Sequence, residues 1–163
     1  MTWEIQLKES IRTIQEVSSV VNISSKEIKR LAHVVERHPM RVPPYYLSLI
    51  DPDDPNDPVR AMALPSVDEL NLMGSYDTSG EKDNTKMPGL QHKYPQTALI
   101  LSTNRCAMYC RHCFRKRLVG LPNHELLQRF DDAAAYVRQH REVNNVLITG
   151  GDPFVLDTSI IAR

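Results

Sequence analysis

The sequence predicts an α/β protein in which an amino-terminal helical region precedes the first two β/α units of a partial, truncated TIM-type barrel. Residues 98–102 (ALILS) and 146–149 (VLIT) are short apolar runs, typical of strands buried on both faces. An amphipathic stretch at 126–140 predicts a helix between them. Strand, loop, helix, strand, loop is the order of a parallel β/α barrel, whose active sites lie in the loops after the strands.

The composition is that of a soluble globular protein. The chain has 163 residues, of which 41% are apolar and 25% charged. Twenty Lys and Arg balance twenty Asp and Glu, so no overall field favours nucleic acid or an anionic membrane. The charged start MTWEIQLKES does not resemble a signal peptide, and no stretch approaches the roughly 20 apolar residues of a membrane span. Three cysteines in one window do not form a disulfide framework and indicate a reducing, cytoplasmic setting.

The first part of the chain carries helix signals. Residues 3–17 repeat apolar side chains at helical spacing and predict one helix. Ser24 and Glu27 fit a capping box that starts a second helix, and Pro39 ends it. Both helices are amphipathic, so we expect them to pack against a core rather than to bind a partner.

Shorter elements are expected after these two helices. Residues 42–50 predict a short helix, and DPDDPNDP after it lacks the glycine and glutamate of an EF-hand loop, so we expect a rigid loop there. Pro65 to Met73 predicts another short helix, with Ser66 and Glu69 as a second capping box.

Three regions follow from these patterns: a helical region at 1–74, a polar connector at 75–96 and the start of a β/α barrel at 97–163. A full barrel takes about 250 residues, or about 30 per unit, so the last region holds about two units. Two parallel strands cannot close a barrel. We therefore expect the amino-terminal piece of a longer enzyme in preference to a truncated reading frame, and we do not expect the chain alone to be active.

The three cysteines of the chain lie close together, at Cys106, Cys110 and Cys113, directly after the first predicted strand. A 4Fe–4S cluster needs four ligands, so the C-x3-C-x2-C spacing can bind three irons and leave the fourth for an external chelator. A structural zinc site would take all its ligands from the chain. His112 is the candidate there, but it adjoins Cys113, and adjacent residues rarely reach one tetrahedral ion together. The pattern resembles that of radical S-adenosylmethionine (SAM) enzymes, in which SAM occupies the open iron and is cleaved to a 5′-deoxyadenosyl radical.

Further residues in the two loops suit a cofactor or a substrate. His112 has the place of an aromatic that packs near the adenine of SAM in radical SAM loops. Arg115 follows the last cysteine by two residues, and its fork can bind a substrate carboxylate bidentately. Gly150 and Gly151 allow a close approach of backbone to a ligand, and Asp152 can accept from the SAM ammonium.

Two basic features have less specific interpretations. Arg111, Lys116 and Arg117 surround Arg115 and predict either a solvated face or a small nucleic-acid patch. Lys93 beside Tyr94 suits a phosphate, although exposed Lys and Tyr side chains are usually solvated.

Longer stretches resemble the lysine 2,3-aminomutase family. They are PPYYLSLIDPDDPNDPVR, PGLQHKYPQTALILSTNRCAMYCRHCFRKRLVG and ITGGDP. The resemblance implies an isomerase with pyridoxal 5′-phosphate (PLP) as a second cofactor, which moves the amino group of L-lysine or a related α-amino acid from carbon 2 to carbon 3. It also implies a small-molecule amino-acid substrate, an electron donor of the flavodoxin or ferredoxin type and no nucleic-acid or membrane partner, and it allows a homo-oligomer in the full-length enzyme.

The resemblance also assigns residues. By position, Cys106, Cys110 and Cys113 match the cluster ligands, Arg115 the arginine for the substrate carboxylate, Gly150, Gly151 and Asp152 the SAM loop, and Lys93 and Tyr94 contacts to the PLP phosphate. Thr97 stands where the family commonly has another phosphate-binding arginine. The family's Schiff-base lysine lies beyond residue 163, so no catalytic residue is assigned. Three alternatives stay open: an inactive remnant, a small zinc-binding interaction module, and a radical SAM enzyme without PLP.

Overall fold

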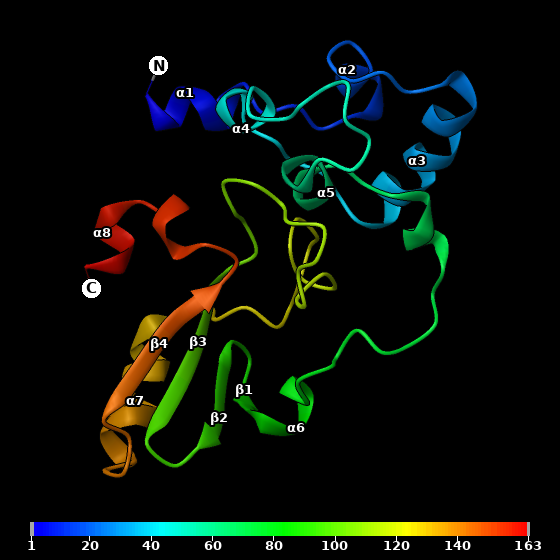
Figure 1. Cartoon of the computed structure of the whole chain (residues 1–163). Coiled ribbons are helices and arrows are strands. Elements are labelled where there is room, and N and C mark those ends of the chain that lie inside the picture. Colours follow the sequence, from blue (N-terminus) through cyan, green and yellow to red (C-terminus); the bar gives the residue numbers. More distant parts are fainter. Residues whose placement is uncertain (1, 163) are drawn as a thin grey trace. The chain divides into compact units, whose positions relative to one another are not determined.

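The computed structural model describes residues 2–162 as a mixed α/β protein made of two compact units. The first unit combines the chain up to residue 74 with residues 107–116. The second combines residues 75–106 with the chain from residue 117 onward. Figure 1 labels their helices and strands. Among residues 2–162, no helix has both the length and the apolar character that crossing a membrane requires.

The first unit is built from short helices. They are α1 (Trp3–Lys8), α2 (Ile14–Val17), α3 (Ser25–Arg37), α4 (Pro44–Leu47), α5 (Pro58–Ala63) and the 3-10 helix η1 (Val67–Leu70). The predicted capping boxes of α3 and η1 are both confirmed. Because a capping box satisfies backbone donors locally, the sequence was sufficient to place these two helix starts.

The single helix predicted over residues 3–17 is wrong. The chain leaves α1 after Lys8, and Ile11 pairs with Val42 in an isolated antiparallel bridge. A new capping box then starts α2: the Glu16 carboxylate accepts from the Thr13 backbone N–H at 2.8 Å, and the Thr13 hydroxyl accepts from the Glu16 N–H at 3.3 Å. This local box and the bridge outweigh the helical periodicity of the apolar residues.

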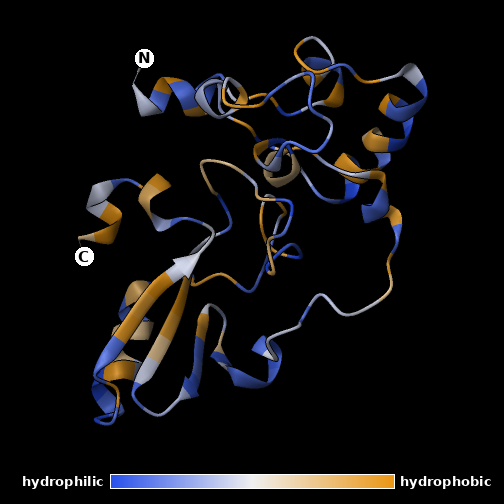
Figure 2. Cartoon of the chain, in the orientation of Figure 1, coloured by the Kyte–Doolittle hydropathy of each residue, from blue (hydrophilic) through white to orange (hydrophobic). Residues whose placement is uncertain are grey.

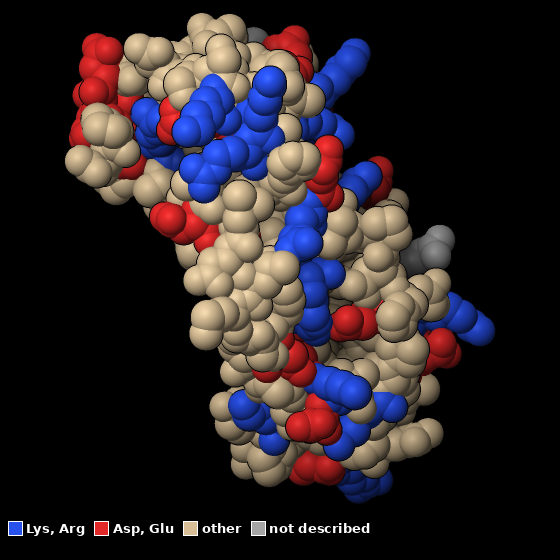
Figure 3. Space-filling model, turned by 90° about the vertical axis from the view of Figure 1, so that its right-hand side faces the viewer, with Lys and Arg blue, Asp and Glu red and all other residues tan. Residues whose placement is uncertain are grey.

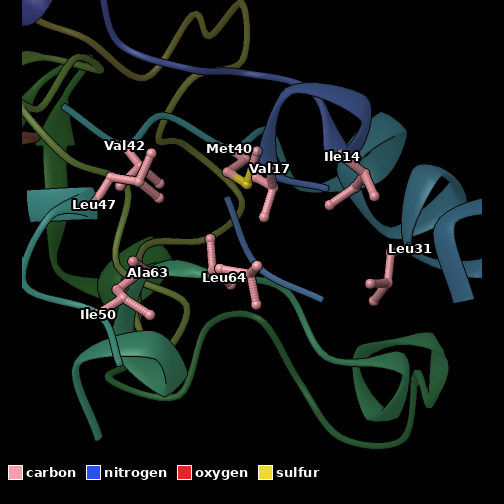
Figure 4. Packing of buried hydrophobic residues seen from close by; sticks show 10 residues of the cluster. Ile14, Val17, Leu31, Met40, Val42, Leu47, Ile50, Ala63 and Leu64 are labelled. Atoms are coloured by element: carbon pink, nitrogen blue, oxygen red, sulfur yellow. The ribbon is translucent and has the colours of Figure 1, made fainter. Parts of the chain in front are cut away.

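A hydrophobic core joins the helices from α2 onward in this unit (Figure 4). Its buried members are Ile14, Val17, Val21, Leu31, Met40, Val42, Leu47, Ile50, Ala63 and Leu64. Met108, from the cysteine-bearing stretch, packs against this core. The helix α5 was not predicted, because its start is hidden in the proline-rich loop. There the buried Asp57 side chain accepts from the backbone N–H groups of Val59 and Asp51, each at 2.9 Å.

The second unit is a four-stranded sheet with helices. Its elements are α6 (Glu81–Asn84), β1 (Thr85–Met87), β2 (Leu90–Tyr94), β3 (Thr97–Thr103), α7 (Phe130–Gln139), β4 (Asn145–Gly150), the 3-10 helix η2 (Pro153–Val155) and α8 (Thr158–Ile161). The strand order is β1-β2-β3-β4, with β3 and β4 parallel and the other pairs antiparallel. Figure 2 shows β3 and β4 as largely hydrophobic ribbons. The two predicted strands therefore exist and pair in parallel.

Two expectations for this unit need correction. Residues 75–96 were expected to be a polar connector, but they contain α6 and the β1–β2 hairpin, whose turn uses Gly89 at a φ of 80°. The helix predicted over 126–140 begins only at Phe130. Leu127 instead enters the small core under α7, and its backbone N–H donates to the Leu101 carbonyl at 2.9 Å.

Candidate functional site

The cysteines lie in a loop that is closed at its base. The backbone N–H of Gly120 donates to the Asn104 carbonyl at 2.8 Å, and the Asn104 side-chain amide donates to the Leu121 carbonyl. We call residues 104–121 the cysteine loop. It leaves the carboxyl end of β3, and all three of its cysteines are half-buried thiols that form no disulfide.

The middle of the cysteine loop is held by the first unit. The backbone N–H of Tyr109 donates to the Arg41 carbonyl at 3.0 Å, and that of Arg111 donates to the Met62 carbonyl at 2.9 Å. Between Cys110 and Cys113 a turn is closed by a hydrogen bond of 3.2 Å from the Cys113 N–H to the Cys110 carbonyl. Two of the three cysteines are thus fixed on a turn that the helical unit supports.

The charge environment of the turn between Cys110 and Cys113 favours the binding of a cation. Burial, and after it the charge of the Cys113 thiolate, raise the pKa of the Cys110 thiol above its ordinary value. The Cys110 thiol therefore resists losing its proton in the absence of a positive charge. A coordinating metal ion reverses this, because a thiol that binds a metal is deprotonated outright.

Arg111 anchors the turn between these two cysteines. Its side chain is only 6% exposed, and its Nε and Nη2 bind the two carboxylate oxygens of Glu69 at 3.1 and 2.6 Å. Its Nη1 donates to the carbonyls of His38 and Pro39, at 3.2 and 3.1 Å. The Lys116 ammonium also binds Glu69 and the Arg111 carbonyl.

This network keeps Glu69 ionised. Burial by itself would raise the pKa of the Glu69 carboxyl, but hydrogen bonds from Arg111 and Lys116 outweigh it, and the pKa lies below its ordinary value. A buried carboxylate with two cationic partners is compensated in charge and well satisfied in hydrogen bonds.

The expectation of a solvated basic face or a nucleic-acid patch is wrong for this run. Arg117 binds Glu81 at 2.8 Å and Glu125 at 2.6 Å, so it is compensated in the same way as Arg111 and Lys116. On the face drawn in Figure 3, several Lys and Arg gather in the upper part, and Lys and Arg lie beside Asp and Glu in the lower part. The basic residues around the cysteines serve internal ion pairs.

Arg115 and His112 differ in their surroundings. The Arg115 side chain is buried, and its guanidinium carbon lies 4.5 Å from the centre of the Phe114 ring, a cation–π distance. His112 is exposed. Both lie in the part of the cysteine loop that belongs to the first unit.

The glycine loop after β4 packs on the entrance to the cysteine loop. The Gly151 N–H donates to the Thr103 carbonyl at 2.6 Å, and the Asp152 N–H donates to the Arg105 carbonyl at 2.8 Å. A Cβ at Gly150 or Gly151 would overlap with these backbone carbonyls, and Gly150 also has a φ of 117°. The sequence suggested that these glycines let the backbone approach a ligand. In the structure they let it approach the backbone of Thr103 and Arg105, directly before Cys106.

Asp152 also shapes this loop. Its Oδ1 accepts from the Phe154 N–H at 3.0 Å and so caps η2. The cap fixes the direction of the carboxylate at the carboxyl end of β4. In parallel sheets this is the edge at which ligands bind.

Lys93 and Tyr94 do not join this group. They end β2, next to the turn that leads into Thr97 at the start of β3. With about 3.3 Å per residue, a strand of this length puts them roughly 20 Å from the entrance to the cysteine loop. The Lys93 ammonium donates to the Ser79 carbonyl at 3.3 Å and lies 5.7 Å from the centre of the Tyr94 ring.

A cavity in the second unit has no predicted ligand residue in its lining. Its volume is about 620 Å³, and its walls include Tyr76, Lys82, Lys86, Met87 and His124.

Sequence reasoning also missed Glu69 as a support of the cysteine loop, although it found this residue as part of a capping box. The only signal in the sequence for this role was the opposite charge of Glu69 and of the basic residues in the cysteine loop.

Comparison with known proteins agrees with these features. The Radical SAM superfamily matches residues 100–162, from β3 through α8. The chain is 43% identical to a putative L-lysine 2,3-aminomutase of Aquifex aeolicus over 148 residues, which cover 91% of the chain and 40% of that relative. It is 40% identical to the L-lysine 2,3-aminomutase of Clostridium subterminale, over 94% of the chain and 38% of the relative. A glutamate 2,3-aminomutase of Clostridioides difficile is 34% identical, over 93% of the chain and 36% of the relative.

These matches agree with the two loops on the class of the protein. The cysteine loop after β3 and the glycine loop after β4 lie in a segment of the radical SAM class. Within that class, the chain is similar to L-lysine 2,3-aminomutases over more than 90% of its own length. It spans about 40% of the length of these relatives.

Proposed function

We propose that this chain is the cluster-binding and SAM-binding part of a PLP-dependent radical SAM aminomutase, an isomerase that moves the amino group of L-lysine or a related α-amino acid from carbon 2 to carbon 3. The observation that carries the proposal is the arrangement of the two loops. The glycine loop packs through Gly151 and Asp152 on the residues that lead into Cys106. The substrate class rests on the similarity to L-lysine 2,3-aminomutases.

The cysteine loop fits an iron–sulfur cluster. Cys106, Cys110 and Cys113 are half-buried thiols, and thiolates are the usual ligands of such clusters. Their number leaves one iron for the amino and carboxylate groups of SAM. When bound, the cluster and SAM together supply the one-electron chemistry that starts hydrogen abstraction from the substrate.

The remaining roles belong to residues of the glycine loop and the cysteine loop. Asp152, held in direction by its cap on η2, accepts from the SAM ammonium. His112 is exposed and packs near the adenine. Arg115 binds the substrate carboxylate with its planar guanidinium fork, which lies 4.5 Å from the centre of the Phe114 ring.

This chain supplies part of the proposed PLP-binding site. Lys93 and Tyr94 are exposed and offer a cation and a phenol to a phosphate, while Thr97 replaces an arginine that the family commonly has. PLP, when bound, carries the amino group during its migration. A cofactor that contacts Lys93 and Tyr94 approaches the sheet from the end of β3 opposite to the cysteine loop.

The edge of the sheet supports the proposal that the active protein is longer than this chain. Among the described residues, β4 pairs only with β3, and its apolar Val146 and Leu147 are 40% and 50% exposed. The sequence predicts this strand to be buried on both faces. Further strands and helices of a partial TIM-type barrel would cover them. The same longer protein would receive its electron from a flavodoxin-type or ferredoxin-type donor in the cytoplasm.

The test begins with the chain itself. Anaerobic reconstitution with iron and sulfide should give a brown protein whose cluster signal changes when SAM is added. Bound zinc without a cluster would favour a small zinc-binding module and reject the proposal.

The second arm tests the substrate. A chimera that joins this chain to the remaining part of the Aquifex aeolicus relative should form 5′-deoxyadenosine and convert L-lysine to β-lysine in the presence of PLP. Turnover in the absence of PLP would support a radical SAM enzyme without it. A folded chimera that binds the cluster and SAM but acts on no amino acid would refute the aminomutase assignment.

A further inference from the structure

A second group of metal-ligand side chains lies in the second unit, away from the cysteines. One ligand atom each from His92, His140 and Glu142 lies within 4.8 Å of the others. His92 is on β2, His140 directly follows α7, and Glu142 is in the turn after it. His92 is near the turn between β2 and β3, so this group is at the end of the sheet opposite to the cysteine loop.

The fold brings these three residues together by two local features. The register of β2 against β3 shifts between Gln91 and Tyr94, and such an irregularity re-aims the side chains within it, here that of His92. The turn after α7 is closed by a hydrogen bond of 3.0 Å from the Val143 N–H to the His140 carbonyl, which holds Glu142 beside His140.

Backbone carbonyls fix the proton positions on both imidazoles. His92 Nε2 lies 3.1 Å from the Pro95 carbonyl, and His140 Nδ1 lies 2.8 Å from the Tyr136 carbonyl. A carbonyl oxygen can only accept, so these two nitrogens carry the protons. In neutral rings the lone pairs are then on His92 Nδ1 and His140 Nε2. Metal-binding histidines show the same pattern, with the second ring N–H donated to a carbonyl or a carboxylate.

The Tyr136 hydroxyl would compete with a metal ion for the lone pair of His92 Nδ1. Its hydroxyl lies 2.9 Å from His92 Nδ1, to which it donates, and its ring stacks on His140 with a centroid distance of 3.8 Å. Burial, and after it the negative charge of Glu142, raise the pKa of the Tyr136 hydroxyl, so the carboxylate acts on the same small region. Two neutral imidazoles and one carboxylate would leave a divalent ion with one net positive charge.

We propose that His92 Nδ1, His140 Nε2 and the Glu142 carboxylate bind a divalent transition-metal ion of the zinc type, with water as the fourth ligand. Imidazole and carboxylate are ligands that zinc accepts in tetrahedral sites, at about 2.0–2.2 Å. The ligand atoms, which lie within 4.8 Å of one another, must move closer together around the ion, and the Tyr136 hydroxyl must release His92. The ion would fasten β2 to the end of α7, and this role is independent of the aminomutase reaction.

Zinc titration of the whole chain tests the site. Cys106, Cys110 and Cys113 are replaced together by Ser, so that thiolates do not compete. We expect one zinc ion to bind per chain. Glu142→Gln should weaken zinc binding at least about tenfold, whereas Asp132→Asn, an exposed acid on the first turn of α7, should leave it unchanged. Tyr136→Phe keeps the ring and the backbone carbonyl but removes the competing hydroxyl, so it should strengthen zinc binding.

A second measurement uses the unaltered chain with its cysteines occupied by iron and sulfide. Added zinc should shift the ¹⁵N resonances of His92 Nδ1 and His140 Nε2, and leave the ring of the exposed His33 unchanged. Shifts at His92 Nε2 or His140 Nδ1 instead would overturn the proposal. So would a titration without saturation, or zinc binding that Glu142→Gln does not weaken.

Discussion

The Glu69 carboxylate accepts two hydrogen bonds from the Arg111 guanidinium, from Nε to Oε1 at 3.1 Å and from Nη2 to Oε2 at 2.6 Å. The same glutamate completes the capping box of η1, where its Oε1 accepts from the Ser66 N–H at 3.0 Å. One carboxylate therefore links the start of a helix to Arg111, one of the two residues between Cys110 and Cys113. The helical unit thereby holds the turn that carries two of the three proposed cluster ligands.

Replacing Glu69 by Gln should loosen the cysteine loop. The change leaves the buried Arg111 and Lys116 charges without their carboxylate, a loss of about 3–5 kcal/mol in buried ion pairs. Chemical denaturation should show this fall in the free energy of unfolding, and reconstitution should give less iron per chain.

Glu27→Gln is the matched control, because Glu27 completes the same kind of capping box on α3 without a buried arginine. It should cost much less stability than Glu69→Gln and leave the iron content unchanged. Equal losses in the two variants would show that Glu69 acts only as a cap.

The Glu69 pair should also make stability depend on pH. Its carboxyl has a lower pKa in the folded protein than the ordinary value of 4.5. A group of this kind contributes its full stabilisation above the unfolded-state pKa and loses it as the pH falls through the folded-state pKa. The difference in unfolding free energy between the parent chain and Glu69→Gln should be constant above about pH 5 and shrink toward lower pH. A difference that grew on acidification would contradict the ion pair.

The sequence predicted those elements whose signals are local. The apolar runs of β3 and β4 and the capping boxes at Ser24 and Ser66 each involve residues a few positions apart. The β1–β2 hairpin was missed because it is polar, and α5 because Asp57 caps it from within a proline-rich loop.

The candidate site was predictable only in part, for a related reason. The cysteine spacing and the glycines after β4 are visible in the sequence. The pairing of Arg111 with Glu69 joins residues 42 positions apart, and no local pattern encodes it. An arginine beside two cysteines therefore looked like part of a basic surface, although its side chain is 6% exposed.

Gly151→Ala should disturb the entrance to the cysteine loop. An alanine Cβ would overlap with the Arg105 carbonyl, and the Gly151 backbone has no unusual φ, so the effect is one of space alone. Overpacking of this kind costs about 1–3 kcal/mol, and SAM binding by the reconstituted protein should weaken with it.

Gly74→Ala supplies the contrast for this prediction. Gly74 has a φ of 104°, and a Cβ added there would meet no other atom within 4 Å, so this variant measures backbone strain without crowding. It should destabilise the chain but leave SAM affinity as it was. If both alanines affected SAM affinity alike, the contact between Gly151 and Arg105 would have no role in the site.

Arg115→Ala should separate substrate binding from SAM cleavage in the chimera with the Aquifex aeolicus relative. Losing a charge-assisted fork to a carboxylate costs about 2–3 kcal/mol, so KM for lysine should rise roughly 30- to 150-fold. Formation of 5′-deoxyadenosine without substrate should change little, because Arg115 makes no contact with the cluster in this assignment.

Phe114→Leu removes the ring under the guanidinium and keeps the charge, so it should raise KM only a few-fold. If Arg115→Ala reduced lysine binding and SAM cleavage by the same factor, Arg115 would be a support of the cysteine loop, as Arg111 is, and not a contact to the substrate.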